Sequence, residues 1–311
     1  MTNSFFTPYD IKPNKKADST VQSELLTDEY EQAELIILGY PDDLGIENNG
    51  GKIGAGLGPD QIRKHLYKMT PQNLKECRTV YDYGNLKISE DLTLEKRHQN
   101  GADTVTKILN ENKKILSLGG GHDYGFADGL GFGETLSENE NVCIFNFDAH
   151  FDLRDLSKGI TSGTPFYRLL EKYGDRLKLF EMGVQKHCNS KSLFDLANKH
   201  ENIHTFTYDH LFPDNEFSKD AFDSTRFGWP ETQTPCFISI DIDGFSSSIA
   251  PGCSQAWPTG FNLSSFFYML DILLFHFDVK ILGIYEVSPP LDHNEQTSRL
   301  ASMIAYRWLH R

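Results

Sequence analysis

The amino-acid sequence predicts an α/β protein with three layers, in which helices cover both faces of a single doubly wound, mostly parallel sheet. Short apolar runs rich in branched residues alternate along the chain with segments whose apolar residues recur at helical spacing. Continuous apolar runs are typical of strands buried on both faces, as in parallel sheets. No shift in composition divides the chain. We therefore expect one domain over residues 31–311, preceded by a loosely ordered lead-in over residues 1–30.

The expected strands and helices alternate along the chain. The first strand, at residues 35–39, reads LIILG, and a helix over 59–69 follows it, with Pro59 suited to its first turn. Branched apolar runs predict the remaining strands at 114–118, 142–147, 178–183, 236–240 and 281–287. Helical spacing predicts the remaining helices at 92–109, 165–173, 192–199, 263–277 and 296–309.

The charge and composition exclude several classes of partner. The 311 residues include 44 acidic and 30 basic side chains, which gives a formal net charge of −14. Such a surface repels phosphate backbones and anionic lipids, so we expect neither nucleic acid nor a membrane as a partner. The longest apolar stretch, residues 266–277, contains Asp271 and is too short to span a bilayer. No secretory signal is visible and the cysteines form no CxxC motif, so we expect a cytoplasmic location.

Histidines and aspartates follow three of the predicted strands, at the point where each strand ends. These segments are GGGH ending at His122, DAHFD at residues 148–152 and DID at residues 241–243. In open α/β sheets, ligands bind outside the carboxyl ends of the strands, so we expect these side chains to meet at one edge. The candidate metal ligands are His122, Asp148, His150, Asp152, Asp241 and Asp243.

The spacing of these residues predicts a binuclear site. In an extended segment residues i, i+2 and i+4 share a face, so Asp148, His150 and Asp152 are expected to project together while Ala149 and Phe151 pack behind them. Four converging carboxylates would raise one another's pKa values unless cations lay between them. Oxygen ligands combined with two imidazoles favour Mn²⁺ over a structural zinc ion. We therefore predict two Mn²⁺ ions per chain, with other divalent ions as alternatives.

Each segment taken alone has an ordinary structural interpretation. A histidine after glycines is typical of a turn, a DxD pair is typical of a strand-end cap, and DxHxD is compatible with a solvated loop. The occurrence of all three directly after strands favours the metal site. The glycine-rich stretches at 54–58 and 129–133 lack the GxGxxG context and the GxxxxGK[ST] pattern, so no nucleotide site is expected.

The three segments resemble the motifs of the ureohydrolase superfamily, which includes arginases and agmatinases, and the resemblance covers the chain from about Gly39 onward. It implies that Asp148 and Asp241 bridge two Mn²⁺ ions in a homo-oligomeric enzyme. The segment YEVSP at 285–289 resembles the last motif of the family, in which the glutamate, here Glu286, faces the cationic group of the substrate. One ion would be held by His122, Asp148, Asp152 and Asp241, and the other by Asp148, His150, Asp241 and Asp243.

Finer details resemble formimidoylglutamase within this superfamily. The similar segments are NGGKIGA at 49–55, GGGH at 119–122, NFDAHFDLR at 146–154 and SGTPF at 162–166. Ser162 stands at the position of the proton-shuttle histidine of arginases. The aspartate with which arginases meet the substrate amino group is replaced near Cys188 and Asn189. Both departures argue against arginine as the substrate.

The resemblance implies hydrolysis of the amidine C–N bond of N-formimidoyl-L-glutamate, with release of L-glutamate and formamide. A hydroxide shared by two ions would attack the formimino carbon. Asp243 would pass a proton to the leaving amine, and Glu286 would pair with the amidinium group.

A substrate with two carboxylates needs a local cation in so acidic a protein. Arg154 follows the DAHFD segment and is our candidate for bidentate binding of a carboxylate, with an ion pair to Asp155 as the alternative interpretation. Weaker candidates for binding the substrate are Asn189, Lys186 and Arg299. His187 and His293 are expected to be ordinary surface residues.

Two alternative functions stay open at this point. One is an agmatinase or guanidinobutyrase type of ureohydrolase, which releases urea from a cationic substrate. The other is a catalytically silent binding protein with the same fold. The presence of all six ligand positions argues against the second alternative.

Overall fold

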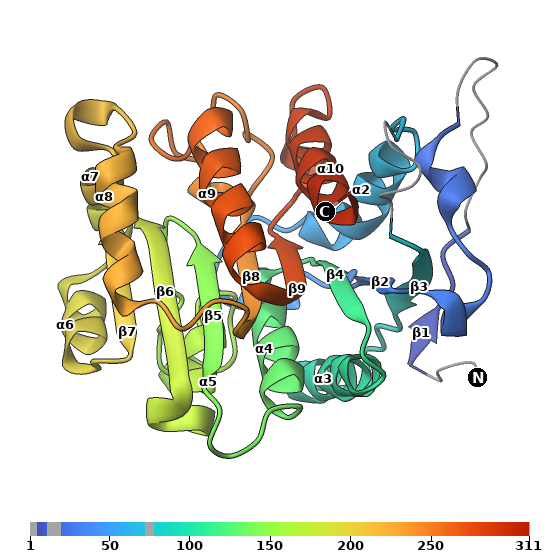
Figure 1. The fold of residues 1–311 in the computed structure, drawn as a ribbon, viewed down its shortest axis with the longest axis horizontal. Coiled ribbons are helices and arrows are strands. Elements are labelled where there is room, and N and C mark those ends of the chain that lie inside the picture. The colour runs from blue at the N-terminus through green and yellow to red at the C-terminus, as the bar shows by residue number, and fades with distance from the viewer. Residues whose placement is uncertain (1–4, 11–19, 72–77, 311) are drawn as a thin grey trace.

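The computed structural model describes residues 5–10, 20–71 and 78–310, and its strands form a single nine-stranded sheet (Figure 1). The strand order is β1-β3-β2-β4-β9-β8-β5-β6-β7, and every neighbouring pair is parallel except β1 and β3. This arrangement confirms the predicted fold class. The strands are β1 (Phe6–Thr7), β2 (Leu35–Gly39), β3 (Val80–Leu86), β4 (Lys114–Leu118), β5 (Val142–Phe147), β6 (Leu177–Val184), β7 (Ile203–Thr207), β8 (Pro235–Asp241) and β9 (Asp278–Tyr285).

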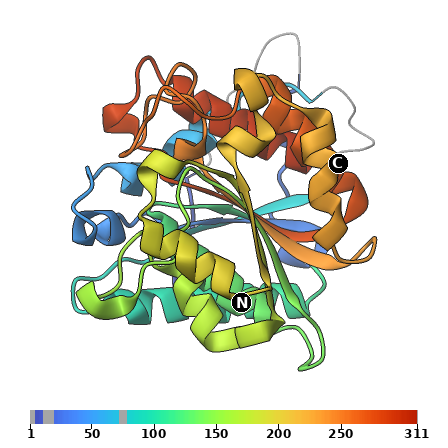
Figure 2. The same ribbon diagram turned by 90° about the vertical axis from the view of Figure 1, so that its left-hand side faces the viewer.

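Two layers of helices enclose the sheet, which Figure 2 shows nearly edge-on. Helices α2, α7, α8, α9 and α10 pack on one face, and α3, α4, α5 and α6 pack on the other. All six helices that the sequence predicts are present. The helices are α1 (Leu44–Asn48), α2 (Gly58–Leu66), α3 (Leu94–Asn110), α4 (Gly125–Gly133), α5 (Pro165–Tyr173), α6 (Lys191–Lys199), α7 (Tyr208–Leu211), α8 (Lys219–Ser224), α9 (Leu263–His276) and α10 (Gln296–Leu309).

Strand β2 illustrates why the central strands read as continuous apolar runs. Leu35 and Ile37 belong to the core on one face, whereas Ile36 and Leu38 belong to the core on the other. All four side chains are fully buried. A strand with one solvent-exposed face alternates apolar and polar residues. Both faces of a central strand such as β2 are covered, so its apolar residues follow one another without alternation.

Strands β3 and β7 and helix α4 were not predicted from the sequence, and their sequences show why. Strand β3 alternates buried and half-buried residues, and β7 is largely half-buried, so polar side chains interrupt both apolar runs. Helix α4 was missed because its sequence is GFADGLGFG. Its glycines allow close packing: a Cβ at Gly131 would lie 2.6 Å from Val105 of α3, and one at Gly129 would lie 2.4 Å from Leu169 of α5.

The described parts of the N-terminal thirty residues pack against the domain. Strand β1 pairs with β3, and the side chains of Phe6 and Val21 are buried. A domain boundary near residue 30 stays a prediction. Across the part of the chain that the structure describes, no helix combines the length and apolar character needed to cross a bilayer.

Candidate metal centre

Four consecutive strands of the sheet carry the predicted site residues at their carboxyl ends. In spatial order these are β4, β9, β8 and β5. The connection from β4 to β5 passes over β9 and β8, which lie between them in the sheet. This edge is therefore a topological switch point, and open α/β sheets bind ligands at such points. His122 follows β4, and Glu286 follows β9. Asp241 is the last residue of β8, and Asp243 follows that strand. The residues that follow β5 are Asp148, His150 and Asp152.

The glycine run before His122 allows the chain to pass between two neighbours. A Cβ at Gly119 would lie 2.2 Å from the ring of Tyr285, and one at Gly120 would lie 1.9 Å from the carbonyl oxygen of Asp42. No side chain fits at either position. The glycines are therefore required by close approach, and they bring His122 to the sheet edge in the 3-10 turn that opens helix α4.

The ligand segments converge through tight turns, which corrects the prediction of an extended DAHFD segment. The chain leaves β5 before Asp148, and a carboxylate oxygen of Asp148 accepts a hydrogen bond from the backbone N–H of His150 at 2.7 Å. Asp241 accepts in the same way from the N–H of Asp243 at 2.8 Å. Asp152 has a left-handed backbone with φ of 49°. Aspartates favour such turns, which bring residues i and i+2 together without strand geometry. Ala149 and Phe151 are fully buried behind the turn, as predicted.

One group of four ligands converges on the imidazole of His122. Its Nδ1 lies 3.2 Å from a carboxylate oxygen of Asp148, 2.9 Å from Asp152 and 3.1 Å from Asp241. The four ligand atoms lie within 4.8 Å of one another. This is the first predicted ligand set, brought together from three separate segments of the chain.

A second group consists of Asp148, His150 and Asp243, also with ligand atoms within 4.8 Å. Nδ1 of His150 lies 3.4 Å from Asp148 and 3.2 Å from Asp243. Asp148 belongs to both groups, as expected of a bridging ligand. Asp241 lies with the first group alone, so its predicted second bond, to the other ion, stays a prediction.

The polar atoms of the first group fit a metal ion. Nε2 of His122 lies 2.8 Å from the hydroxyl of Ser239, and Nδ1 is buried without a hydrogen-bond partner in the described part of the chain. With the proton on Nε2, the lone pair of Nδ1 faces three carboxylates. A divalent cation between these atoms removes the repulsion and satisfies a buried nitrogen that would otherwise be unpaired.

The electrostatics of the floor of the site lead to the same conclusion. Burial, together with neighbouring carboxylates, raises the pKa values of Asp241 and Glu286 well above their usual range. Burial also raises the pKa of Asp243 to about 6. Burial alone would raise the pKa of Asp148, but the neighbouring imidazoles of His122 and His150 hold it below its usual range. Carboxylates so placed favour a shared positive charge.

Glu286 lies beside the two ligand groups in a strained conformation. Its φ is 65°, and its backbone N–H donates to the carbonyl of Gly120 at 2.8 Å. One carboxylate oxygen accepts from the backbone N–H of His122 at 3.0 Å. A left-handed non-glycine residue costs about 1–3 kcal/mol, and such strain is concentrated at functional sites. The contacts fix the Glu286 carboxylate at the edge of the metal site.

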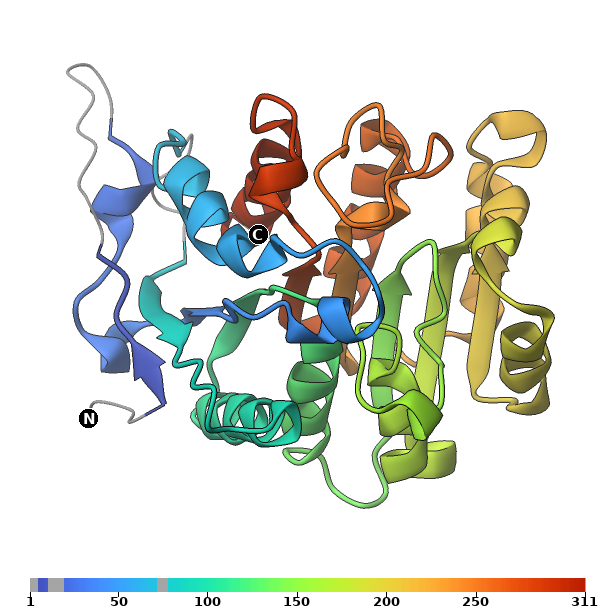
Figure 3. The same cartoon turned by 180° about the vertical axis from the view of Figure 1, so that it is seen from behind.

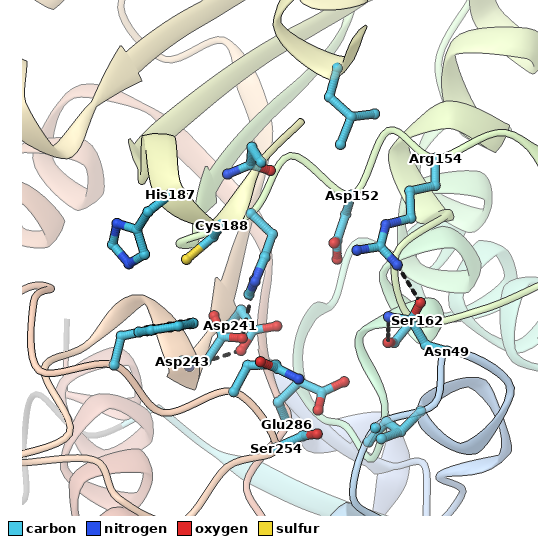
Figure 4. A pocket seen from close by; sticks show the side chains of 17 residues that line it. Asn49, Asp152, Arg154, Ser162, His187, Cys188, Asp241, Asp243, Ser254 and Glu286 are labelled. Atoms are coloured by element: carbon cyan, nitrogen blue, oxygen red, sulfur yellow. Dashed lines mark hydrogen bonds and ion pairs between the residues drawn. The ribbon is translucent and has the colours of Figure 1, made fainter. Parts of the chain in front are cut away.

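Four metal ligands, His150, Asp152, Asp241 and Asp243, line a cavity of about 240 Å³ together with Glu286, whereas His122 and Asp148 are fully buried. We call the six metal ligands and Glu286 the floor of the cavity. Figure 4 shows Arg154 on its wall, pointing toward Asn49 and Ser162. The Arg154 guanidinium donates to the side-chain oxygen of Asn49 at 2.6 Å, and the Asn49 amide donates to Ser162 at 3.1 Å. The bond between Arg154 and Asn49 joins the end of helix α1 to the loop that follows β5, and Figure 3 shows these two segments next to each other. Among the described residues Arg154 has no ion pair, and Asp155 instead accepts from the N–H of Ser157.

The structure gives Asn189 a positioning role. Its amide donates to the carbonyls of Ala149 and Gln185, each at 2.8 Å, and its side-chain oxygen accepts from the N–H of Phe151 at 3.1 Å. The side chain thus fixes the DAHFD turn. Asn189 also borders the cavity, and its binding of substrate stays a prediction.

The other weak candidates lie away from the cavity. Lys186 pairs with Asp209 at 2.8 Å, and Arg299 lies 3.7 Å from Glu295 on α10. His187, which the sequence predicts to be an ordinary surface residue, lines the cavity with Trp257. The rule that located the other residues applies to it as well, because the turn that carries it follows the carboxyl end of β6.

Comparisons with known proteins agree with this geometry. The arginase family model matches residues 33–310. The chain is 31% identical over 273 residues to a formimidoylglutamase of Staphylococcus haemolyticus, covering 88% of this chain and 85% of that protein. It is 30% identical over 281 residues to a formimidoylglutamase of Streptococcus pyogenes, covering 89% and 84%.

Solved structures show the same fold. A variant of Trypanosoma cruzi formiminoglutamase with Mn²⁺ superimposes with a TM-score of 0.82 at 25% identity, covering 94% of this chain and 98% of that one. The formimidoylglutamase of Bacillus subtilis superimposes with a TM-score of 0.80 at 24% identity, covering 98% and 96%. From its ligand clusters and a family match over almost its whole length, the chain belongs to the arginase family and is a metal-dependent amidine hydrolase.

Proposed function

We propose that this enzyme hydrolyses N-formimidoyl-L-glutamate to L-glutamate and formamide. The observation that carries the proposal is Arg154, a guanidinium without an ion pair in the described chain, on the wall of a cavity whose floor is acidic. A cationic guanidino substrate would be repelled by this arginine, whereas a carboxylate would be bound by it. The names of the relatives at 30–31% identity support the same substrate.

The two ligand groups would hold two divalent ions, and we propose Mn²⁺, which is present in the Trypanosoma cruzi structure. When bound, the ions supply Lewis-acid stabilisation and a water molecule of lowered pKa. In the net reaction, the oxygen of one water molecule is joined to the formimino carbon. The bond from that carbon to the glutamate nitrogen then breaks, and the water protons are shared between formamide and the free amine.

Asp243 is the group we assign to proton transfer. Its carboxylate lies in the second ligand group, and one of its oxygens is buried without a hydrogen-bond partner in the described chain. That oxygen is available to carry a proton to the leaving nitrogen. A carboxylate that reaches both the water and the leaving group can act first as a general base and then as a general acid.

Glu286 is the group we assign to the amidinium. Its second carboxylate oxygen is available, because the first is held by the N–H of His122. An amidinium presents two N–H donors in one plane, which suits a buried carboxylate. The contact would orient the formimino carbon over the floor of the site.

A product-resolved assay tests the proposal. Mn²⁺-loaded protein is incubated separately with N-formimidoyl-L-glutamate, agmatine and 4-guanidinobutanoate, and formamide and urea are quantified. We expect formamide from the first substrate and no urea from the others. If agmatine gave urea and N-formimidoyl-L-glutamate gave no formamide, the agmatinase alternative would be established. If no substrate gave a product and the protein bound fewer than two ions per chain, the protein would be a silent binding protein.

We propose a cytoplasmic homo-oligomer with a small-molecule substrate and with no nucleic-acid or membrane partner. The net charge of −14 supports the exclusion of polyanionic partners. Light scattering on the loaded protein measures the assembly.

A further inference from the structure

The cavity has a second base on its wall, opposite Arg154. Of the residues that line the cavity, the bases outside the metal ligands are Arg154 and His187. Figure 4 shows them on opposite sides, with Asp241 and Glu286 between them. His187 makes no ion pair among the described residues, whereas its neighbour Lys186 is held by Asp209 at 2.8 Å. The wall therefore offers two separate donors above an acidic floor.

The turn that carries His187 is fixed on both sides. It is the 3-10 turn Lys186–Cys188, and it is flanked by two side-chain amides. On one side Gln185, which is buried, accepts from the Thr259 hydroxyl at 2.5 Å and donates to the Thr259 carbonyl at 3.3 Å. On the other side Asn189 is bonded to the DAHFD turn through Phe151 and Ala149. These bonds hold His187 at a set position relative to the metal ligands.

An aromatic contact orients the imidazole itself. The rings of His187 and Trp257 meet edge to face, with centroids 4.8 Å apart and an interplanar angle of 78°. Trp257 lies two residues before Thr259, so the same Gln185 contact fixes both partners. A ring packed in this way loses little further freedom when it binds a ligand, which favours recognition.

We propose that His187 is the second carboxylate anchor of the enzyme and that it binds the carboxylate that Arg154 does not. This inference rests on the proposed function. N-formimidoyl-L-glutamate carries two carboxylates, and the floor repels both because it is built from aspartates and a glutamate. One guanidinium binds one carboxylate in its bidentate mode. The second carboxylate needs a separate N–H donor, and His187 is the remaining base on the wall.

The test combines residue changes with substrate changes. Three substrates are compared: N-formimidoyl-L-glutamate, N-formimidoyl-L-glutamine, which lacks the side-chain carboxylate, and N-formimidoyl-4-aminobutanoate, which lacks the α-carboxylate. The variants are His187→Ala, His187→Gln and Arg154→Ala, with His293→Ala as a matched exposed histidine outside the cavity lining. KM and kcat are measured separately, and bound Mn²⁺ is measured for each variant.

We expect His187→Ala to raise the KM for N-formimidoyl-L-glutamate about tenfold with kcat nearly unchanged. The effect should vanish on one of the two analogues, and that of Arg154→Ala should vanish on the other. His187→Gln, which keeps an N–H donor, should restore part of the affinity, and His293→Ala should behave as wild type. An unchanged KM, or equal increases for all three substrates, would overturn the proposal.

Binding of the product separates this inference from the proposed reaction. Absence of formamide from the wild-type protein would contradict the reaction. Calorimetry with L-glutamate on Mn²⁺-loaded protein tests the anchor without turnover. His187→Ala should weaken L-glutamate about tenfold, and an unchanged affinity would contradict the anchor even in an active enzyme.

Discussion

The floor and the rim of the cavity differ in burial, charge and origin. The floor consists of metal ligands and Glu286, which come from the ends of four adjacent strands and are mostly buried. The rim consists of the wall residues Arg154, Asn49 and His187, which come from loops and a short turn and are exposed. Without cations the floor is electrostatically unfavourable, whereas the rim groups are stable in water. Under the proposed function, the floor would carry out the reaction and the rim would select the substrate.

The largest effect is expected on removing the ligand that both groups share. Asp148→Ala removes one carboxylate ligand from each group, so bound Mn²⁺ should fall below two ions per chain. Loss of the binuclear centre should lower kcat/KM by about 10³-fold or more. Elemental analysis and steady-state kinetics measure the two effects. Asp155→Asn, which changes an exposed carboxylate on the same loop, is the control, and full metal content in Asp148→Ala would contradict the assignment.

A smaller effect is expected at the edge of the floor. Glu286→Gln keeps a side-chain oxygen for the N–H of His122 but removes the charge that would face the amidinium. We expect kcat/KM to fall about 10²-fold, because a desolvated charge-assisted contact is lost while both ions stay bound. Kinetics with parallel metal analysis distinguish this outcome from metal loss. Wild-type activity in the variant would remove Glu286 from the mechanism.

Asp128 is a buried acid outside the metal ligands, and it shows what burial without a cation does. The hydroxyls of Tyr40 and Tyr285 donate to its two oxygens, and the ring of Tyr285 stacks on that of His122 with centroids 4.8 Å apart. Burial raises the pKa of Asp128 to about 6, although these hydrogen bonds oppose the shift.

The sign of the pH effect follows from this raised pKa. Between about pH 4 and pH 6 the folded protein keeps a proton that the unfolded chain has released, so its free energy of unfolding falls as the pH rises. The pKa of Asp128 is raised by about two units, which corresponds to about 3 kcal/mol in the free energy of unfolding. The difference in stability between wild type and Asp128→Asn should fall by about this amount from pH 4 to pH 7, as measured by urea unfolding. A constant difference would show that Asp128 does not titrate there.

The smallest effect is expected from the support of Arg154. Asn49→Ala removes the oxygen that accepts from its guanidinium at 2.6 Å. Arg154 would keep its charge but lose its fixed position, so the KM for N-formimidoyl-L-glutamate should rise about threefold with kcat unchanged. Asn48→Ala, at the neighbouring residue, serves as a control. A change in kcat instead of KM would place Asn49 in the chemistry of the floor.

The floor residues could be predicted from the sequence because they lie in short motifs at equivalent positions, directly after apolar runs. His122, Asp148 and Asp241 each belong to a short motif directly after an apolar run, and parallel strands end at the same edge of a sheet. The continuous apolar runs also identified the central strands, since both their faces are buried. Strand β3 was missed because only one of its faces is fully buried, so its sequence lacks a continuous apolar run.

The rim was decided by the tertiary structure, because its contacts join segments far apart in the chain. Whether Arg154 faces Asp155 or the cavity depends on Asn49, about a hundred positions away. The amide of Asn189 holds the DAHFD turn, and its predicted binding of substrate stays a prediction. His187 follows the carboxyl end of β6, but its place on the cavity wall depends on the folded chain. The sequence by itself determined the fold class and the chemistry of the metal ligands, since short motifs and periodicity carry both. The direction of each rim side chain arises from long-range hydrogen bonds and packing that only the folded chain creates.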